Sequence, residues 1–354
     1  MSLVRQFDLQ ARACAKLGSP LYAALLTGIS RDIEADGPCA RVLAEHAEAP
    51  PADAVPLRLL GGVHALVLTG QAPELAAYYP SAAGAPARAA EDGAREAFRE
   101  VVAAHPEWIR DWLTRPPQTN EVGRAVPLLA GLLAAVDAIA LPVRLLELGS
   151  SAGLNLRADR FHWYTDDFEW GPPDSPVSLG GAWAGAVPGW LARAARRHPR
   201  LTVVERRGCD PAPLDPLSPG GALALRSYVW PDQRERAARL DGALRVAARI
   251  PADVTAVGAA EFLAQVEPVP GTLTVVWHSV MRQYVPRDQW VLVTKELDRL
   301  AAASGPDAGF AHIAFEPMAR SGSGFPLTVR IGNGPAVELA RAKPHGIPAF
   351  VAQE

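Results

Sequence analysis

The chain has 354 residues, 49% of them hydrophobic and 21% charged, which is enough to bury one large core or two ordinary ones. Its formal net charge of −3 leaves no basic excess to neutralise a phosphate backbone, so nucleic acid is not expected as the main partner. The three cysteines are too scattered for a disulfide framework or a metal site, and no apolar run indicates a signal peptide or a membrane span. We therefore expect a cytoplasmic protein without a metal ion.

The first part of the chain has a helical pattern. Residues 1–140 carry Ala, Leu, Glu and Arg at helical spacing, interrupted by the pairs Pro50–Pro51 and Pro116–Pro117. Helices are predicted over 8–17, 21–33, 58–68, 87–104 and 123–140. These predict a helical N-terminal domain over residues 1–125, which we expect to cover the site and to supply substrate contacts.

From residue 126 onward, strands and helices alternate. Short apolar strands are predicted at 143–149, 201–205, 254–258, 273–278, 310–316 and 327–331. Helices are predicted at 232–249, 260–265 and 287–303. Strands that alternate with helices predict a doubly wound α/β domain with a mainly parallel sheet over 126–354. A segment rich in Trp, Gly and Pro at about 161–190 is predicted to be an insertion.

The strongest local motif is the run of small residues that follows the first strand, Glu147-Leu-Gly149-Ser150-Ser151-Ala-Gly153-Leu-Asn155. Glycine permits a positive φ and a close approach of a ligand to the backbone, and a following helix start supplies free N–H groups. The acidic residue at the strand end offers an acceptor to a cationic or hydroxylated group. The sequence therefore predicts a ligand-binding turn.

Three interpretations of this turn compete. A dinucleotide fingerprint is a poor match, because Ser151 and Leu154 stand at its second and third glycine positions. The pattern E-x-G-x-x-x-G resembles instead the first motif of class I methyltransferases, in which the glycine turn packs beside the methionine part of S-adenosylmethionine. The same residues also fit G-x-S-x-G, the nucleophile elbow of α/β-hydrolases, with Ser151 as the nucleophile and His345 as a base. That elbow normally follows several strands, which this chain lacks before residue 143.

Acidic residues follow the second predicted strand. Glu205 and Asp210 are both candidates to accept hydrogen bonds from the two hydroxyls of a ribose, as the resemblance to class I methyltransferases implies. The alternative is a proline-rich turn that an Asx-type hydrogen bond stabilises. Both interpretations remain open.

Two side chains end the strand predicted at 273–278. In open α/β sheets ligands bind beyond the carboxyl ends of the strands, so His278 and Ser279 are expected to face the site. A neutral imidazole there could remove a proton from an acceptor near pH 7. The alternative is a histidine that only ends the strand.

Polar side chains also precede the first strand. Gln118, Asn120, Glu121 and Arg124 lie just before the helix predicted at 123–140. They either cap that helix or bind substrate, with Arg124 holding a carboxylate and Glu121 as a second candidate base. Farther along, Tyr228 and Trp230 either form a wall of the site or belong to a core.

Taken together, the chain resembles a bacterial family of domain-of-unknown-function proteins assigned to the methyltransferase-like Rossmann superfamily. The motifs that carry the resemblance are Gly18-Ser-Pro-Leu-Tyr22, Tyr78-Tyr-Pro80, Gln118 to Arg124, Glu147 to Leu156, Gly208-Cys-Asp210, Tyr228 to Gln233 and Val276 to Ser279. The resemblance implies a fold and not a particular reaction. We expect an S-adenosylmethionine-dependent methyltransferase that acts on a small molecule. The alternatives are a serine hydrolase and a non-catalytic ligand-binding protein.

Overall fold

The computed structural model describes residues 1–82, 84, 91–318 and 324–351, and the chain divides into two compact units. The first unit comprises Met1–Thr119 and Ser218–Ala237, and the second comprises Asn120–Leu217 and Ala238–Glu354. The sequence predicts a single boundary near residue 125. The structure differs because the segment 218–237 returns to the first unit, where Tyr228 Oη accepts a hydrogen bond of 3.1 Å from Trp112 Nε1.

The first unit is helical, as predicted. The helices at 8–17, 21–33 and 58–68 are found as α1, α2 and α4, and α1 starts earlier because the Ser2 side chain caps the N–H of Arg5. The first residues of the helix predicted at 87–104 lie outside the described residues. The elements are α1 (Leu3–Lys16), α2 (Pro20–Glu34), α3 (Pro38–Val42), η1 (Ala44–His46), η2 (Pro51–Asp53), α4 (Val55–Leu68), α5 (Pro73–Ala76), η3 (Pro80–Ala82), α6 (Glu91–Ala104), α7 (Pro106–Leu113) and α10 (Pro219–Ser227).

Helix α4 forms the centre of the first core. The described segment Pro51–Leu68 has the length and composition to cross a membrane, but 61% of it is buried inside the structure. Leu59, Leu60 and Val63 are fully buried in a cluster that also contains Phe7 and Phe98. Burial against neighbouring helices accounts for this apolar composition.

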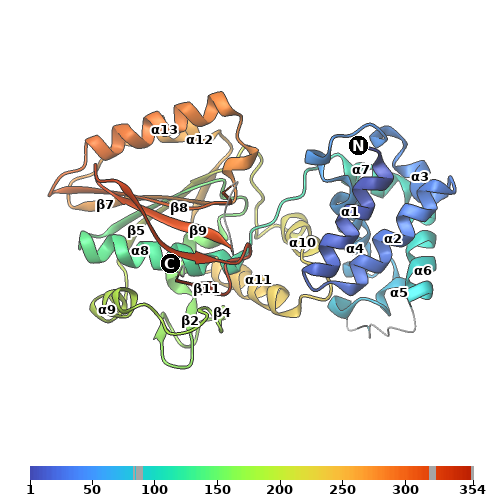
Figure 1. Ribbon diagram of the computed structural model, residues 1–354, viewed down its shortest axis with the longest axis horizontal. Coiled ribbons are helices and arrows are strands. Elements are labelled where there is room, and N and C mark those ends of the chain that lie inside the picture. The colour runs from blue at the N-terminus through green and yellow to red at the C-terminus, as the bar shows by residue number, and fades with distance from the viewer. Residues whose placement is uncertain (83, 85–90, 319–323, 352–354) are drawn as a thin grey trace. The chain divides into compact units, whose positions relative to one another are not determined.

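The second unit is built on an eight-stranded, mostly parallel sheet with the strand order β11-β10-β9-β8-β7-β1-β5-β6 (Figure 1). Strands β1, β5, β6, β7 and β8 are parallel, whereas β9, β10 and β11 follow in antiparallel pairs. The bounds are β1 (Val143–Leu148), β5 (Val203–Cys209), β6 (Asp253–Thr255), β7 (Thr272–Ser279), β8 (Ala308–Phe315), β9 (Phe325–Ile331), β10 (Ala336–Ala342) and β11 (Ala349–Phe350). The α/β class is therefore confirmed.

Helices cover both faces of this sheet. Figure 1 places α12 (Ala259–Ala264) and α13 (Arg287–Ala302) on one face and α8 (Ala125–Ala138) on the other. Phe262 and Leu297 pack against Leu146 of β1 on the first face. On the second face, Gly131 brings α8 so close to β8 that a Cβ there would lie 2.7 Å from Ile313 Cγ2.

Two segments differ from the prediction. The expected insertion contains a small sheet of β2 (His162–Tyr164), β3 (Glu169–Trp170) and β4 (Ser178–Leu179), followed by α9 (Gly189–Arg197). Three of its tryptophans, Trp163, Trp170 and Trp183, are core residues. Helix α11 (Arg234–Ala247), predicted at 232–249, begins in the first unit and continues in the second.

Candidate functional site

The central strand β1 marks the point at which the order of strands in the sheet reverses. After β1 the chain adds β5 and β6 on one side, and it then returns to add β7 and β8 on the other. Ligands of open α/β sheets bind beyond the carboxyl ends of the strands at such a point. The residues that follow β1, β5 and β7 therefore form the candidate site of the second unit.

The turn after β1 has a backbone that favours glycine. Gly149 and Gly153 have φ values of +68° and +65°, and Ser151 between them has a φ of +52°. A Cβ on Gly149 would lie 2.7 Å from Met281 Cβ, and a Cβ on Gly153 would lie 2.8 Å from Val254 Cγ2. Both glycines are thus required by conformation and by space.

Ser150 fixes the turn to the two neighbouring strands. Its N–H donates to the Cys209 carbonyl (3.0 Å), and its hydroxyl donates to the Glu147 carbonyl (2.8 Å). Gly208 in β5 makes room for this hydroxyl, because a Cβ there would lie 1.9 Å from Ser150 Oγ. Ser150 is therefore a structural residue of the turn, and its hydroxyl is committed to the backbone.

A short 3₁₀ segment, η6 (Leu154–Arg160), stands where an α-helix was predicted. Its first N–H, that of Leu154, donates to Asn120 Oδ1 at 2.8 Å. Asn155 Nδ2 donates to the Glu121 carbonyl at 3.2 Å, while its buried Oδ1 has no hydrogen-bond partner among the described residues. The structure thus brings the segment 120–121 together with the turn.

Glu147 is the most unusual carboxylate of the second unit. It is only 3% exposed, and its Oε2 has no hydrogen-bond partner among the described residues. Burial raises the pKa of Glu147 to about 8, and Asp210 raises it further, while Arg157 and Arg124 oppose the change. Trp277, the in-register neighbour of Glu147 on β7, has a buried Nε1 that makes no full hydrogen bond within the described chain, but its side chain lowers the pKa of the Glu147 carboxyl.

Glu121 and Arg124 come from the segment that precedes α8 and β1, and Arg124 lies close enough to Glu147 to affect its carboxyl. Glu121 is buried, and its Oε1 accepts a hydrogen bond of 3.1 Å from the N–H of Gly123 at the start of η5 (Val122–Arg124). Arg124 Nε donates to the Pro344 carbonyl at 3.3 Å, and its charge lowers the pKa of Glu147. The predicted role of Arg124 in holding a carboxylate stays a prediction.

Asp210 connects the end of β5 to the turn after β1. Its Oδ2 accepts a hydrogen bond of 2.9 Å from the N–H of Ser151, and its Oδ1 accepts one of 3.0 Å from the N–H of Ala212. The bond from Ala212, two residues on, is that of an Asx-type turn, which is one of the two interpretations of the sequence. The other interpretation, Asp210 as a ligand acceptor, stays a prediction.

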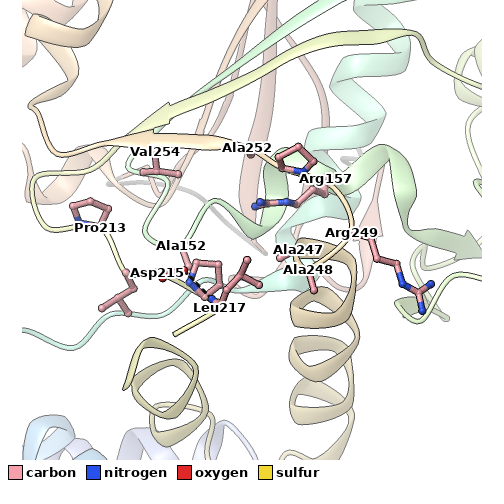
Figure 2. Close-up of a pocket in the computed structure, with 13 residues that line it drawn as sticks. Ala152, Arg157, Pro213, Asp215, Leu217, Ala247, Ala248, Arg249, Ala252 and Val254 are labelled. Carbon is pink, nitrogen blue, oxygen red and sulfur yellow. Dashed lines mark hydrogen bonds between the residues drawn. The ribbon is translucent and has the colours of Figure 1, made fainter. Parts of the chain in front are cut away.

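A cavity of about 460 Å³ adjoins the turn (Figure 2). Ala152 of the turn, Arg157 of η6 and Val254 of β6 lie on its wall. The loop 213–217 and the segment after α11 complete its lining. Arg157 is 4% exposed and supplies the most deeply buried charge of this lining.

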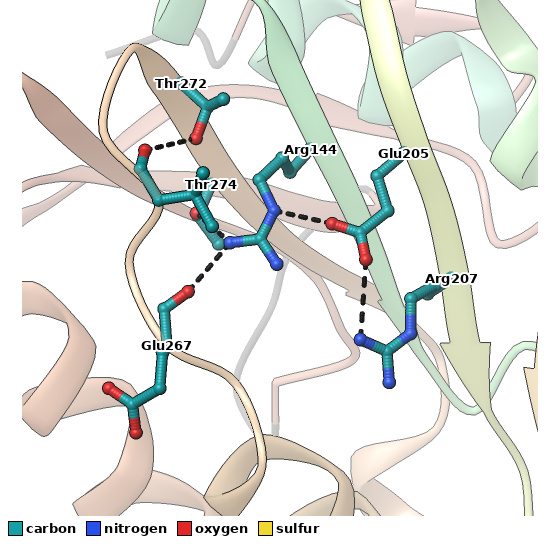
Figure 3. Close-up of polar contacts among 7 residues, drawn as sticks. Arg144, Glu205, Arg207, Glu267, Thr272 and Thr274 are labelled. Atoms are coloured by element: carbon teal, nitrogen blue, oxygen red, sulfur yellow. Dashed lines mark hydrogen bonds and ion pairs between the residues drawn. The ribbon is translucent and has the colours of Figure 1, made fainter.

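Glu205 is not at the site, contrary to the prediction. Strand β5 continues to Cys209, so Glu205 lies within it and pairs in register with Arg144 near the start of β1. Glu205 Oε2 accepts a hydrogen bond of 2.5 Å from Arg144 Nε, and Arg207 Nη1 lies 3.4 Å from its Oε1 (Figure 3). Glu205 therefore neutralises a buried arginine at the amino end of the strand.

His278 lies one residue before the end of β7, and both of its ring nitrogens have partners within the protein. It is 1% exposed, its Nδ1 donates to Glu316 Oε1 at 2.7 Å, and its Nε2 lies 3.0 Å from His312 Nε2. Burial lowers the pKa of His312 to about 3, so His312 is neutral and shares one proton with the facing nitrogen. The contacts with Glu316 and His312 thus leave neither ring nitrogen of His278 open to a substrate in this structure.

Three further predicted contact residues lie in the first unit. Trp230 is partly buried and packs against Tyr22 with a ring-centroid distance of 6.2 Å, and the buried Tyr228 packs with Trp112. The alternative that they belong to a core is therefore favoured for Tyr228. Gln118 lies just before the boundary between the units. In the second unit, Ser279 ends β7 and is half-buried.

The sequence missed Arg157, Trp277 and Glu316, which are all buried near the carboxyl ends of the central strands. A charged residue within an otherwise apolar stretch could have indicated a buried functional side chain, as for Arg157 in the run after Gly153. Among the described residues, no group of three His, Cys, Asp or Glu side chains is placed to hold a metal ion.

A family described as an uncharacterized protein conserved in bacteria, DUF2332, matches residues 4–350. No curated protein and no solved structure matches the chain. The match covers nearly the whole chain, as the sequence motifs predicted for a bacterial family of this kind.

Proposed function

We propose, for a chain that belongs to the bacterial DUF2332 family, that the site at the end of β1 binds S-adenosylmethionine and that the protein transfers its methyl group to a small molecule. The observation that carries this proposal is the buried Glu147 carboxylate beside a turn with positive φ values, since its Oε2 accepts no hydrogen bond from any residue that the structure describes. A buried carboxylate is stable when an opposite charge pairs with it. The ammonium group of the cofactor supplies that charge.

The other residues of the turn also suit this cofactor. Asp210 holds a carboxylate directly beside the turn, where it would accept from the ribose hydroxyls, and the glycines leave no Cβ between ligand and backbone. A pyrophosphate suits the turn less well, because Glu147 and Asp210 are acidic and Asn120 already occupies the first N–H of η6. The donor set thus favours a cationic nucleoside over a dinucleotide.

The bound cofactor would supply an electrophilic methyl group. The protein would then contribute mainly position, by holding the acceptor in line and excluding water. With the lone pairs of His278 committed, Glu121 remains as the candidate base for an acceptor that has to lose a proton. Arg124, whose charge already influences Glu147, is the candidate partner for an acidic group.

The serine hydrolase alternative is less favoured by the topology. The turn that carries Ser151 follows the first strand of the sheet in chain order, whereas a nucleophile elbow follows several strands. The Ser151 N–H also donates to the Asp210 carboxylate. This carboxylate places a negative charge beside the serine, where a hydrolase needs hydrogen-bond donors to stabilise the oxyanion of its intermediate.

Isothermal titration with S-adenosylhomocysteine tests the cofactor proposal. Glu147 has a pKa of about 8, so it is mostly protonated at pH 7, and pairing with the ligand's ammonium should release close to one proton. Titrations at pH 7 in phosphate and in Tris buffer should therefore give different apparent enthalpies. Glu147→Gln should abolish this difference and weaken binding by roughly 10- to 100-fold, the effect of losing a charged hydrogen bond.

Glu205→Gln is the matched control, because it changes a carboxylate at the opposite end of the neighbouring strand and should leave both quantities unchanged. Binding of NAD without binding of either adenosyl compound would contradict the proposal. Turnover can be tested by incubating the protein with S-adenosylmethionine and a bacterial small-molecule extract. If the protein binds the cofactor but forms no S-adenosylhomocysteine, a non-catalytic binding protein is favoured.

A further inference from the structure

We propose that the cavity beside the glycine turn is a binding site for a small carboxylate with a compact apolar body, and that Arg157 holds the carboxylate. This site belongs to the second unit alone, since all of its lining residues lie there. The proposal does not depend on the identity of the ligand at Glu147.

The walls of the cavity are suited to an apolar body. Its volume of about 460 Å³ is in the range of pockets that enclose small organic ligands. Ala, Pro, Leu and Val form most of the lining, with Ala152, Leu214, Ala247 and Val254 among them. Burying the carbon atoms of a ligand against such a wall favours binding, because it removes apolar surface from water. The same wall offers few hydrogen-bond partners to a strongly polar molecule.

Arg157 is held in place by the backbone around the cavity. Its Nε donates to the Ile250 carbonyl at 2.8 Å, and its Nη1 donates to the Gly153 carbonyl at 2.7 Å. These bonds leave Nη2 without an acceptor among the described residues, and Figure 2 shows the guanidinium directed into the cavity. A fixed, planar guanidinium loses little conformational freedom when it binds a carboxylate.

The surrounding charges leave Arg157 open to an anion. Arg206, whose charge lowers the pKa of Arg157, is already paired through two hydrogen bonds of 2.6 and 2.8 Å with Asp159. Burial lowers the pKa of Arg157 to about 10, so it remains charged at pH 7, whereas Glu147 is mostly neutral there. Asp215 at the rim uses its Oδ1 to accept from the N–H of Leu217. One buried cation among apolar walls suits a single carboxylate better than a phosphate dianion.

Matched pairs of probes test the charge requirement. Ligand-observed NMR and isothermal titration should be done with benzoate against benzamide and with hexanoate against hexanamide. Each amide keeps the shape and removes the charge, so it should bind at least about tenfold more weakly, the effect of about 1.4 kcal/mol. Equal binding of acid and amide, or no binding of either acid at millimolar concentration, would overturn the proposal.

Two variants locate the site. Ala248→Trp places a large side chain at the exposed rim of the cavity and should abolish carboxylate binding, while Ala302→Trp, at the exposed end of α13, should not. Arg157→Lys keeps the charge but loses the planar fork and should weaken benzoate binding while the protein remains folded by circular dichroism. Unchanged benzoate binding in Ala248→Trp would place the ligand elsewhere and end the proposal.

Glu147→Gln separates this proposal from the cofactor proposal. It should retain benzoate binding, because a neutral amide replaces a side chain that is mostly neutral at pH 7. Loss of S-adenosylhomocysteine binding with retained benzoate binding in this variant supports two separate sites. Loss of both ligands in a folded Glu147→Gln protein would contradict a separate carboxylate site.

Discussion

At the scale of single residues, the site contains polar groups that folding alone does not satisfy. Glu147 Oε2, Asn155 Oδ1 and Trp277 Nε1 are all buried without hydrogen-bond partners among the described residues. Each such group costs about 1–3 kcal/mol relative to a satisfied one. Glu147 and Trp277 are neighbours in register, and Trp277 lowers the pKa of the carboxyl, so these two groups partly compensate each other. A ligand at this end of the strands would supply the hydrogen bonds that Glu147 Oε2 and Asn155 Oδ1 still lack among the described residues.

Glu147 should make the stability of the protein depend on pH. Its folded-state pKa of about 8 exceeds its ordinary value of 4.5, so between these values the folded state binds more protons than the unfolded state. The free energy of unfolding contributed by this residue is therefore greatest below about pH 4.5 and falls as the pH rises towards 8. Glu147→Gln removes this dependence, and its melting temperature should rise relative to that of the wild type between pH 5 and 8.5.

Melting temperatures of both proteins across this range, without ligand, provide the measurement. His64, whose pKa burial lowers to about 4, is present in both proteins, so its effect cancels in the difference. Parallel curves for the two proteins would show that Glu147 ionises normally in the folded state.

At the scale of elements, the length of β5 decides which acidic residue belongs to the site. The strand ends at Cys209, so Asp210 follows its carboxyl end while Glu205 lies towards its amino end. Arg144, 8% exposed, needs Glu205 as its counter-ion and also donates to the Glu267 carbonyl at 2.8 Å. Glu205 within β5 is thus a structural carboxylate, whereas Asp210, directly after β5, contacts the glycine turn.

Substitutions at these two positions should have opposite effects. Glu205→Ala leaves the buried Arg144 without its counter-ion and should lower the free energy of unfolding by about 1–3 kcal/mol while S-adenosylhomocysteine binds as before. Asp210→Ala releases the N–H groups of Ser151 and Ala212 and should weaken binding of the same ligand. Urea unfolding and isothermal titration on both variants measure the two effects. A loss of affinity in Glu205→Ala with unchanged stability would reverse this assignment.

At the scale of the whole molecule, the first unit is completed by a distant part of the chain. The segment 218–237 supplies Tyr228 to Trp112, the Ser227 carbonyl to His64 Nδ1 at 3.0 Å, and Asp232 to the hydroxyl of Ser19. A Cβ on Gly61 would lie 2.6 Å from a ring carbon of Tyr228, so α4 is shaped to receive this segment. The unit therefore cannot be complete within residues 1–119.

A fragment of residues 1–119 should consequently be unstable. Without residues 218–237 the fragment exposes His64 and the core face of α4, and we expect a broad, weakly cooperative thermal transition by circular dichroism. A single chain that joins residues 1–119 to 218–237 through a flexible linker should restore a cooperative transition. Its Tyr228→Ala version, which loses the ring that packs on Gly61, serves as the control. A cooperative transition in the 1–119 fragment itself would contradict this view.

The sequence by itself determined the kinds of element and the place of the turn. Helical spacing before residue 140, alternating strands and helices after it, and the small residues from Gly149 to Gly153 are local patterns, and local backbone preferences act on them directly. They were sufficient for the α/β class, the helical first unit and the position of the candidate site at the end of β1. They also placed His278 at the end of its strand.

Only the tertiary structure decided which of these residues are available to a ligand. His278 contacts His312 of β8 and Glu316, the residue that follows β8, and Glu205 pairs with Arg144. Tyr228 is buried in the first unit, and Trp230 packs against its core. Each outcome depends on the register of neighbouring strands or on the return of a distant segment. Those contacts join residues separated by tens to more than a hundred positions, and hydrophobic periodicity within a single element carries no information about them.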